Sequence, residues 1–391
     1  MLMKNVLERI QGSLFGKRRI SRLEKRLAET EAQFSEMFHA IVPKLLDANP
    51  HGFDVMKLAS GRGAYFREFE IVRNILPRLD FKYQEGDRAD CAFLWGSRPI
   101  YSNVRAVTAA LKSGCPLLCC EDGFLRSADT WANTKFGRRY NHGCSIVFDS
   151  LGYYYDATRA SEIENMLNDK SLVVSAEQRA EARRLIDRIV AAKLTKYNHQ
   201  PIYTPELGRP GHRKVLVIDQ SYGDFAIRKG WGSEQTFADM LADAIRDNPD
   251  ADILVKTHPD TMTGKRAGYY DEVREGDNIF RVTFPVNPYS LMELVDKVYV
   301  CSTQLGFEAL MAGKDVHVYG MPFYAGWGLT VDSQRNPRRT NTRSIEEVFY
   351  IFYVLYTHWY DSENGTPCSI DTAIDNLIKL REEYRRLQEG R

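Results

Sequence analysis

The sequence predicts an α/β fold in which two Rossmann-like domains face a central cleft, preceded by an N-terminal helical segment. The chain has 391 residues, of which 43% are hydrophobic, enough material for two packed cores. Short apolar stretches alternate with amphipathic ones in two successive series, as in parallel sheets whose strands are joined by crossover helices. A loop with Pro201, Pro205 and Pro210 separates the two series and indicates a linker.

The N-terminal segment, residues 1–50, carries a heptad pattern. Apolar residues recur there in steps of three and four, at Ile20, Leu23, Leu27, Phe34, Met37 and Ile41. Such a seam pairs two helices in a coiled coil, or it packs on the body of its own protein. A basic cluster at residues 17–19 adds a third interpretation, contact with anionic lipid.

The first domain is expected over residues 51–205 and the second over residues 206–370. In the first domain, strands are predicted at 91–96 and 116–124, and helices at 104–112 and 177–193. In the second domain, strands are predicted at 214–219, 252–259, 297–301 and 316–320, and helices at 233–247, 289–294 and 306–312. A last helix, predicted at 370–387 within the C-terminal segment 371–391, is able to cross back to the first domain.

The composition excludes several classes of partner. Basic and acidic side chains number 53 and 52, so no net charge draws the chain toward nucleic acid or a bilayer. No apolar stretch is long enough to span a membrane, and the first thirty positions are unlike a secretory signal, so a cytoplasmic location is expected. Seven cysteines lie mostly in apolar runs, without the paired CxxC units of a zinc site, and are interpreted as reduced core residues.

A group of polar residues follows the predicted strands of the second domain, where ligands of parallel α/β sheets bind. His258 ends one strand, the pair Ser302-Thr303 ends another, and Gly306 then opens a helix whose free N–H groups favour an anion. Glu308, in the first turn, is suited to the two hydroxyls of a ribose. Taken singly, these are a structural histidine, a helix cap and a dipole-complementing acid. Together they predict a nucleotide site.

Two acidic residues end strands on opposite sides of the expected cleft. Asp224 closes the loop "QSYGD" of the second domain, and Glu121 begins "EDGFLR" in the first. A nucleophile and a proton shuttle are the carboxylates that retaining glycosyl transfer requires. Gln220, in the same loop as Asp224, and Lys256, at the end of the adjacent strand, are further candidate contacts of the donor.

The stretch from 302 to 330 is rich in rings and glycines. Tyr324 and Trp327 either form a wall against a sugar nucleotide or belong to a buried aromatic core. The glycines allow close approach of the backbone in both cases.

These motifs, in this order, resemble those of the KpsC-type capsule polysaccharide synthesis proteins, a family of bacterial retaining β-Kdo glycosyltransferases. The resemblance rests on "FLWGSRP", "EDGFLRS", "SIVFDSLGYYYDATRASEIE", "DQSYGDFAI", "KTHPD", "GFEALMAGKDVHVYGMPFYAGWGLT" and "GTPCSIDTAID", which lie between residues 85 and 375. It implies a GT-B fold, CMP-β-Kdo as donor and β-linked Kdo in a product such as capsule or O-antigen. It also implies that the location extends to the inner face of the inner membrane.

The resemblance also implies roles at the matching positions. His258 and the pair Ser302-Thr303 would contact the phosphate of the cytidine monophosphate, and Glu308 would contact its ribose. By the same resemblance, Asp224 is similar to the carboxylate that forms a glycosyl-enzyme adduct. Glu121 would then be the acid/base.

The chemistry of the implied donor adds two expectations. A single phosphate can be neutralised by side chains and a helix N-terminus, and no convincing DxD motif is present, so the enzyme is expected to need no metal or other cofactor. Kdo carries a carboxylate on its anomeric carbon, which a basic side chain would bind. The candidates for this contact are Arg126, Lys256, Arg138 and Arg139.

The chain departs from the family pattern in three ways. Thr257 stands where a proline is common, and the hydroxyl pair reads Ser-Thr instead of Thr-Ser. One catalytic module is present where the larger capsule-initiating members have two, which leaves the acceptor open. Two alternatives are kept: a transferase with another donor, such as CMP-sialic acid or a UDP-sugar, and a non-catalytic polysaccharide-binding or scaffold subunit.

Overall fold

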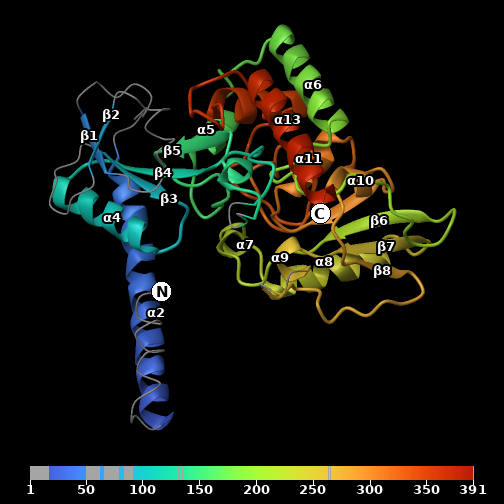
Figure 1. Ribbon diagram of the computed structural model, residues 1–391, viewed down its shortest axis with the longest axis horizontal. Coiled ribbons are helices and arrows are strands. Elements are labelled where there is room, and N and C mark those ends of the chain that lie inside the picture. Colours follow the sequence, from blue (N-terminus) through green and yellow to red (C-terminus); the bar gives the residue numbers. More distant parts are fainter. Residues whose placement is uncertain are drawn as a thin grey trace.

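The computed structural model describes residues 17–49, 62–65, 79–82 and 91–390, apart from 131, 132, 134, 263 and 265. In these residues the strands form two sheets of six strands each, flanked by helices (Figure 1). The predicted fold class, an α/β protein of two Rossmann-like halves with a helical N-terminal extension, is confirmed.

The first sheet has the strand order β12-β5-β4-β3-β1-β2. Its strands are β1 (Arg62–Tyr65), β2 (Leu79–Lys82), β3 (Cys91–Trp95), β4 (Leu117–Asp122), β5 (Ser145–Asp149) and β12 (Thr357–Trp359). β1 to β4 pair in parallel, whereas β5 runs antiparallel to β4 and to β12. The carboxyl end of β4, which carries Glu121, therefore lies in the interior of the sheet order, where ligands of such sheets are bound.

The second sheet has the order β11-β10-β9-β6-β7-β8, and all its pairs are parallel. Its strands are β6 (Arg213–Ile218), β7 (Ala251–Lys256), β8 (Ile279–Val282), β9 (Lys297–Val300), β10 (Asp315–Val318) and β11 (Val331–Asp332). β7 is buried along its whole length, as expected for a strand covered by helices on both faces. Because β9, β6 and β7 are neighbours, the loops that follow them meet at one edge.

Helices cover both sheets and connect them. They are α2 (Lys17–Asp47), α4 (Tyr101–Ser113), η2 (Arg138–Asn141), α5 (Glu162–Asn168), α6 (Ala176–Ala191), α7 (Phe225–Lys229), α8 (Glu234–Arg246), α9 (Pro259–Met262), α10 (Pro288–Met292), α11 (Leu305–Met311), α12 (Ile345–Phe349), the π-helical η3 (Tyr350–Tyr356) and α13 (Ile370–Glu389). Capping boxes at Ser175 and Ser233 fix the starts of α6 and α8. None of the helices in the described part of the chain combines the length and the apolar run needed to span a bilayer.

The C-terminal part of the chain returns to the first sheet. β12 pairs with β5, although residues 357–359 fall in the range expected for the second domain. The aromatic side chains of η3 pack in the core between the sheets, and this packing carries the chain across. α13 then lies along α6, where Asp371 pairs with Arg184 at 2.7 Å and with Arg188 at 2.5 Å. The hydroxyl of Tyr384 donates to Asp129 at 2.7 Å.

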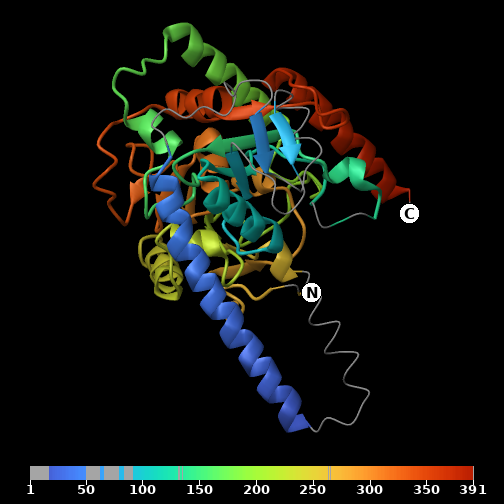
Figure 2. The same ribbon diagram turned by 90° about the vertical axis from the view of Figure 1, so that its left-hand side faces the viewer.

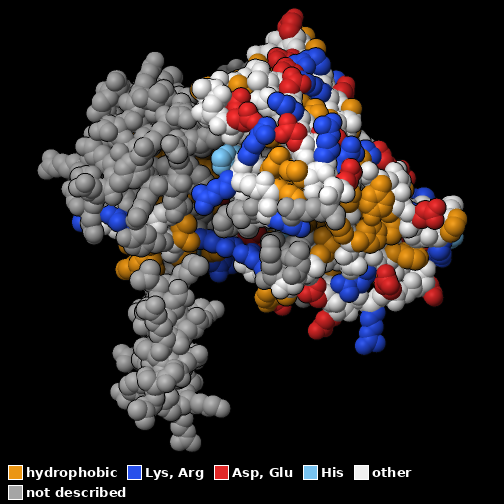
Figure 3. Space-filling view, in the orientation of Figure 1, with side chains coloured by type: hydrophobic (Ala, Val, Ile, Leu, Met, Phe, Trp, Pro, Cys, Tyr) orange, Lys and Arg blue, Asp and Glu red, His pale blue; other side chains and the backbone are white. Residues whose placement is uncertain are grey.

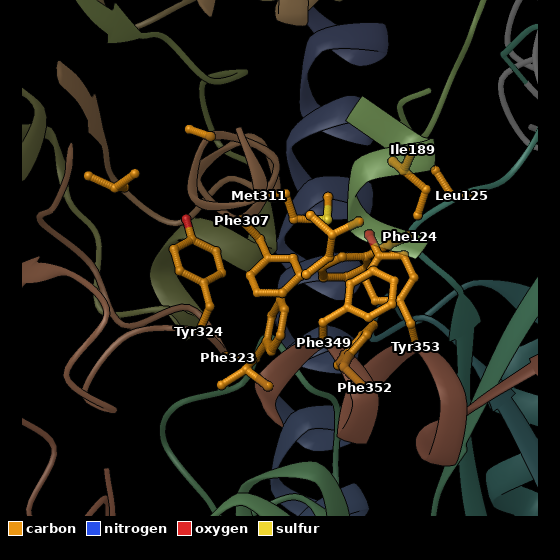
Figure 4. Close-up of a cluster of buried hydrophobic side chains, with 14 of the residues drawn as sticks. Phe124, Leu125, Ile189, Phe307, Met311, Phe323, Tyr324, Phe349, Phe352 and Tyr353 are labelled. Atoms are coloured by element: carbon orange, nitrogen blue, oxygen red, sulfur yellow. The ribbon is translucent and has the colours of Figure 1, made fainter. Parts of the chain in front are cut away.

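A cluster of aromatic rings joins the two halves (Figure 4). Phe124, from the loop after β4, has ring-centroid distances of 4.8 Å to Phe323 and 4.3 Å to Phe352. Phe307, on α11, lies 5.2 Å from Phe323. Gln304 Nε2 also donates to the backbone oxygen of Phe124 at 2.7 Å. The loop that follows Glu121 at the end of β4 is thus fixed against the helix that follows β9.

The helix α2 packs on the first half with its C-terminal part, while its N-terminal part extends away from both sheets (Figures 1 and 2). Phe38, Val42 and Leu46 are buried against α4, β3 and β4. This face is offset by one residue from the predicted seam, because Met37 is 53% exposed. For this part of the helix, packing on its own body is confirmed. The side chains of the more N-terminal seam residues and of the basic cluster lie outside the described residues.

The offset face gives a matched pair of substitutions in α2. Phe38→Ala removes a buried ring, and we expect it to lower the free energy of unfolding by about 3 kcal/mol. Met37→Ala, one position away and exposed, should change it by less than about 0.5 kcal/mol. Urea denaturation measures both. A larger loss for Met37→Ala would show that the predicted seam faces the protein after all.

Candidate active site

The loops after β6, β7 and β9 meet through two side-chain contacts. Ser221 Oγ and His258 Nδ1 share a hydrogen bond of 2.9 Å, which joins the loops after β6 and β7. Gln220 Oε1 accepts from the backbone N–H of Ser302 at 3.0 Å, which joins the loops after β6 and β9. The structure therefore brings Gln220, His258 and Ser302 together, and Gln220 acts here as a bridge between two loops.

Asp224 lies at the start of α7. Its Oδ1 accepts from the backbone N–H of Ala226 at 3.2 Å, and its own N–H donates to Ser221 O at 3.2 Å. The carboxylate is half-buried and lies three residues from the serine that holds His258. Asp224 thus caps α7, and the same contacts fix it next to the histidine loop.

The hydroxyl groups of Ser302 and Thr303 lie in different surroundings. Ser302 Oγ is buried beside the Cys301 thiol and has no nitrogen or oxygen partner among the described residues. Thr303 Oγ1 accepts from the backbone N–H of Leu305 at 3.3 Å, just before α11, whose N-cap residue is Gln304. A buried hydroxyl without a partner costs free energy unless a ligand satisfies it.

Gly306 has a clear packing role. A Cβ atom at this position would lie 2.1 Å from the hydroxyl oxygen of Tyr324, which itself donates to Thr303 O at 2.6 Å. No side chain fits between them, so glycine is required for the Tyr324 contact. The structure gives no separate indication that Gly306 touches a nucleotide.

Glu308 is buried, with 4% of its surface exposed. Its Oε1 accepts from Gln304 Nε2 at 3.2 Å, and the backbone N–H of Lys196 also donates to the carboxyl group. Burial raises the pKa of Glu308 to about 8, so the group is mostly protonated at neutral pH. A protonated carboxyl both donates and accepts hydrogen bonds, as a ribose hydroxyl requires. The ribose contact itself stays a prediction.

Glu121 lies at the end of β4, against the loop after β3. Its Oε1 accepts from the backbone N–H of Asp122 at 3.0 Å, and its Oε2 faces Gly96. Burial raises the pKa of Glu121 to about 7, against the opposing effect of the Lys196 ammonium. A carboxyl group with a pKa near neutrality can take and return a proton at physiological pH.

The segment after β5, whose Tyr154 and Tyr155 are electrostatic neighbours of Glu121, is tied to the helix that Asp224 begins. Asp156 pairs with Lys229, at the end of α7, at 2.9 Å, and the backbone N–H of Ala157 donates to Lys229 O at 3.0 Å. From α2, the ring of His39 stacks on Phe225, the residue after Asp224, at 4.6 Å. These contacts hold α7 between the two sheets, where Figure 1 shows it. Figure 3 shows basic side chains gathered along the same junction.

Three residues that were predicted to contact the sugar or the acceptor are buried in the protein. Tyr324 and Trp327 are 0% exposed, and Trp327 Nε1 donates to Phe323 O at 2.7 Å, so both belong to the aromatic core and not to a wall of the cleft. Arg126 is 6% exposed. Its Nε donates to Asp122 at 2.8 Å and its Nη1 to Asn141 O at 2.7 Å, so it braces the loop after β4.

The other basic candidates have different surroundings. Lys256 is 5% exposed, and its ammonium donates to Thr257 O at 3.0 Å. Burial lowers the pKa of Lys256 to about 8. Arg139 pairs with Glu363 at 2.6 Å and with Glu383 at 3.1 Å on the surface. Lys256 therefore remains close to the site, at the end of β7, while Arg139 is engaged elsewhere.

Lys196 is a site residue that the sequence did not reveal. Its backbone oxygen accepts from the N–H groups of Arg126 and Ser127, each at 3.2 Å, while its own N–H donates to Glu308. It therefore contacts both halves. No motif marks Lys196, since it lies in the segment before the proline-rich linker, and only the folded chain brings it beside Glu121.

The chain is similar to known proteins of surface polysaccharide synthesis. The model of the family described as "Capsule polysaccharide biosynthesis protein" matches residues 90–359. The capsule polysaccharide modification protein LipA of Neisseria meningitidis serogroup A is 35% identical over 333 residues, which cover 82% of this chain and 46% of LipA. The lipopolysaccharide-processing protein LpsZ of Rhizobium meliloti is 32% identical over 335 residues, covering 83% of this chain and 73% of LpsZ.

A solved structure matches across the whole arrangement. KpsC of Thermosulfurimonas dismutans, a β-Kdo 2,4 transferase, superimposes with a TM-score of 0.72 at 32% identity, covering 84% of this chain and 100% of that chain. The chain thus spans less than half of the length of LipA but all of this KpsC chain. The resemblance inferred from the motifs is confirmed: the chain belongs to the capsule polysaccharide biosynthesis protein family.

Proposed function

We propose that this protein is a retaining glycosyltransferase that moves Kdo from CMP-β-Kdo to a bacterial surface glycan, or to its lipid-linked precursor, on the cytoplasmic side of the membrane. One observation carries the proposal: the strand-end group of Asp224, His258 and Ser302 is tied through α7 and Asp156 to the segment after β5, whose Tyr154 and Tyr155 are electrostatic neighbours of Glu121. The likeness to a β-Kdo 2,4 transferase supports Kdo as the transferred sugar.

The proposed reaction has two displacements. Asp224 attacks the anomeric carbon, a bond from its carboxylate oxygen to that carbon forms, and the bond from the carbon to the CMP phosphate breaks. His258 and Ser302 donate hydrogen bonds to the departing phosphate and stabilise its charge. Glu121 then takes the proton of an acceptor hydroxyl, whose oxygen displaces Asp224. Two inversions give net retention, and CMP and the Kdo-acceptor product leave.

The adduct on Asp224 gives a direct test. Glu121→Gln removes the base of the second step but leaves the first, so incubation with CMP-Kdo should increase the intact mass by one Kdo, mapped by peptide fragmentation to Asp224. We expect transfer by this variant to fall by about 100- to 10,000-fold. Asp224→Ala should form no adduct yet still bind CMP.

Three results of that experiment would contradict the proposal in different ways. An adduct on another side chain overturns the nucleophile and leaves the transferase. CMP release from CMP-sialic acid instead of CMP-Kdo overturns the donor. A wild-type protein that releases no CMP from any donor, with acceptors from capsule and lipopolysaccharide precursors present, supports a binding or scaffold subunit.

Glu121 also gives the reaction a characteristic pH dependence. The group acts as a base in its ionised form, and burial raises its pKa to about 7. We therefore expect the transfer rate to reach a plateau above about pH 7 and to fall about tenfold per pH unit below it. Glu121→Gln should flatten this limb along with lowering the rate. A rate that instead falls as pH rises through 7 would contradict the assigned role.

We propose that the reaction needs no metal ion. His258, Ser302 and Lys256 lie at the strand ends, where their side chains would offset the charge of a single phosphate. Transfer after EDTA treatment and gel filtration should keep its full rate. A loss of activity that added Mg²⁺ or Mn²⁺ restores would overturn this part of the proposal.

A further inference from the structure

Lys196 connects the two halves of the site through its backbone and extends its side chain toward Glu121. Its carbonyl oxygen holds the loop after β4 through Arg126 N and Ser127 N. Its N–H holds Glu308 of α11. A residue fixed from both sides has little freedom, so the position of its ammonium is set by the fold.

The ammonium of Lys196 lies among groups that leave its charge without a close counterion. It is 6.0 Å from the centroid of the Tyr197 ring, and Tyr154, Asp122 and Glu121 are its other electrostatic neighbours. Among the described residues no carboxylate oxygen lies within 4.0 Å of it. Asp122 already pairs with Arg126 at 2.8 Å.

This half-buried cation is therefore suited to bind an anion. Its neighbours raise the pKa of Lys196 against the effect of burial, so the side chain stays charged at physiological pH. Glu121 is one of these neighbours but forms no ion pair with it. A half-buried charge gains most from a partner with the opposite charge that binds in the same partly desolvated place.

We infer that Lys196 binds the carboxylate of the transferred sugar, an inference that rests on the proposed function. The base Glu121 must reach the acceptor oxygen that attacks the anomeric carbon, and the carboxylate of a 2-ulosonic acid is bonded to that same carbon. A cation beside Glu121 is thus within reach of the carboxylate. The phosphate leaves from the face of the carbon that the acceptor later enters, and His258 and Ser302 are the groups proposed to hold it.

The other basic side chains are placed less well for this contact. Arg126 is engaged with Asp122 and with the backbone, and Arg139 pairs with two surface glutamates. Lys256 is buried at the end of β7, in the half that holds the phosphate groups. Lys196 would therefore select acidic sugars over neutral hexoses, because a neutral donor leaves the ammonium unpaired.

The test compares CMP-Kdo with CMP, which lacks the acidic sugar. For Lys196→Met we expect kcat/KM for CMP-Kdo to fall by about 10- to 100-fold, while the Kd of CMP, measured by calorimetry, changes less than about twofold. Lys196→Arg should recover part of the loss because the charge is kept. Lys193→Met, on the same segment but paired with Glu293 at 2.8 Å, is the matched control and should leave kcat/KM unchanged.

Each other outcome overturns a defined part of the inference. Equal losses in CMP affinity and in kcat/KM would assign Lys196 to the phosphate instead of the carboxylate. Unchanged kcat/KM in Lys196→Met, with an active wild type, would reduce it to a structural residue, and the unaltered CMP affinity would show that the variant is folded. A wild type that does not turn over CMP-Kdo would overturn the proposed function, and this inference with it.

Discussion

The insertion of Phe124 into the aromatic cluster of the opposite half is the contact on which the site depends. Glu121 is near the end of β4 and Phe124 follows three residues later, so the packing that holds the ring also fixes the carboxyl group relative to the second sheet. A buried phenylalanine of this kind contributes about 3–5 kcal/mol to stability. Gln304 strengthens the same connection because it donates both to the Phe124 carbonyl and to Glu308.

Burial, more than specific charge pairing, sets the acid–base character of the site. Desolvation is the largest influence on the pKa of Glu121, of Glu308 and of Lys256, and each moves toward neutrality. The same packing that joins the halves therefore prepares groups that exchange protons near pH 7. Ser302 is affected by burial as well, because its hydroxyl lies beside the Cys301 thiol and has no nitrogen or oxygen partner among the described residues.

The strand ends of the second half were predictable because parallel strands place the loops after them at one edge. His258, Ser302 and Asp224 follow strands with clear apolar patterns, and their neighbourhood follows from topology alone. Whether a particular ring is buried could not be predicted from the topology in the same way. Tyr324 and Trp327 read equally well as a cleft wall or as core, and only the positions of Phe323 and Gly306 in space decide between them.

The sequence pattern also could not predict which distant segments of the chain pack together. β12 joins the first sheet after more than one hundred intervening residues, and no periodicity in a short segment records its partner. Lys196 is the clearest case, since it has no motif and its contacts are with the loop after β4 and the helix α11, which only the fold brings together. Arg126 illustrates the converse: a basic residue in a motif is held by Asp122 and by the backbone oxygen of Asn141.

The central claim is that loops from both sheets enclose one nucleotide-sugar site. A crystal structure of the complex with CMP tests it most directly. We expect the phosphate of CMP to lie within hydrogen-bonding distance of His258 and Ser302. The carboxyl groups of Asp224 and Glu121 should face the open space beside this phosphate. A CMP molecule bound elsewhere, or a bound CMP from which Glu121 is separated by packed side chains, would contradict it.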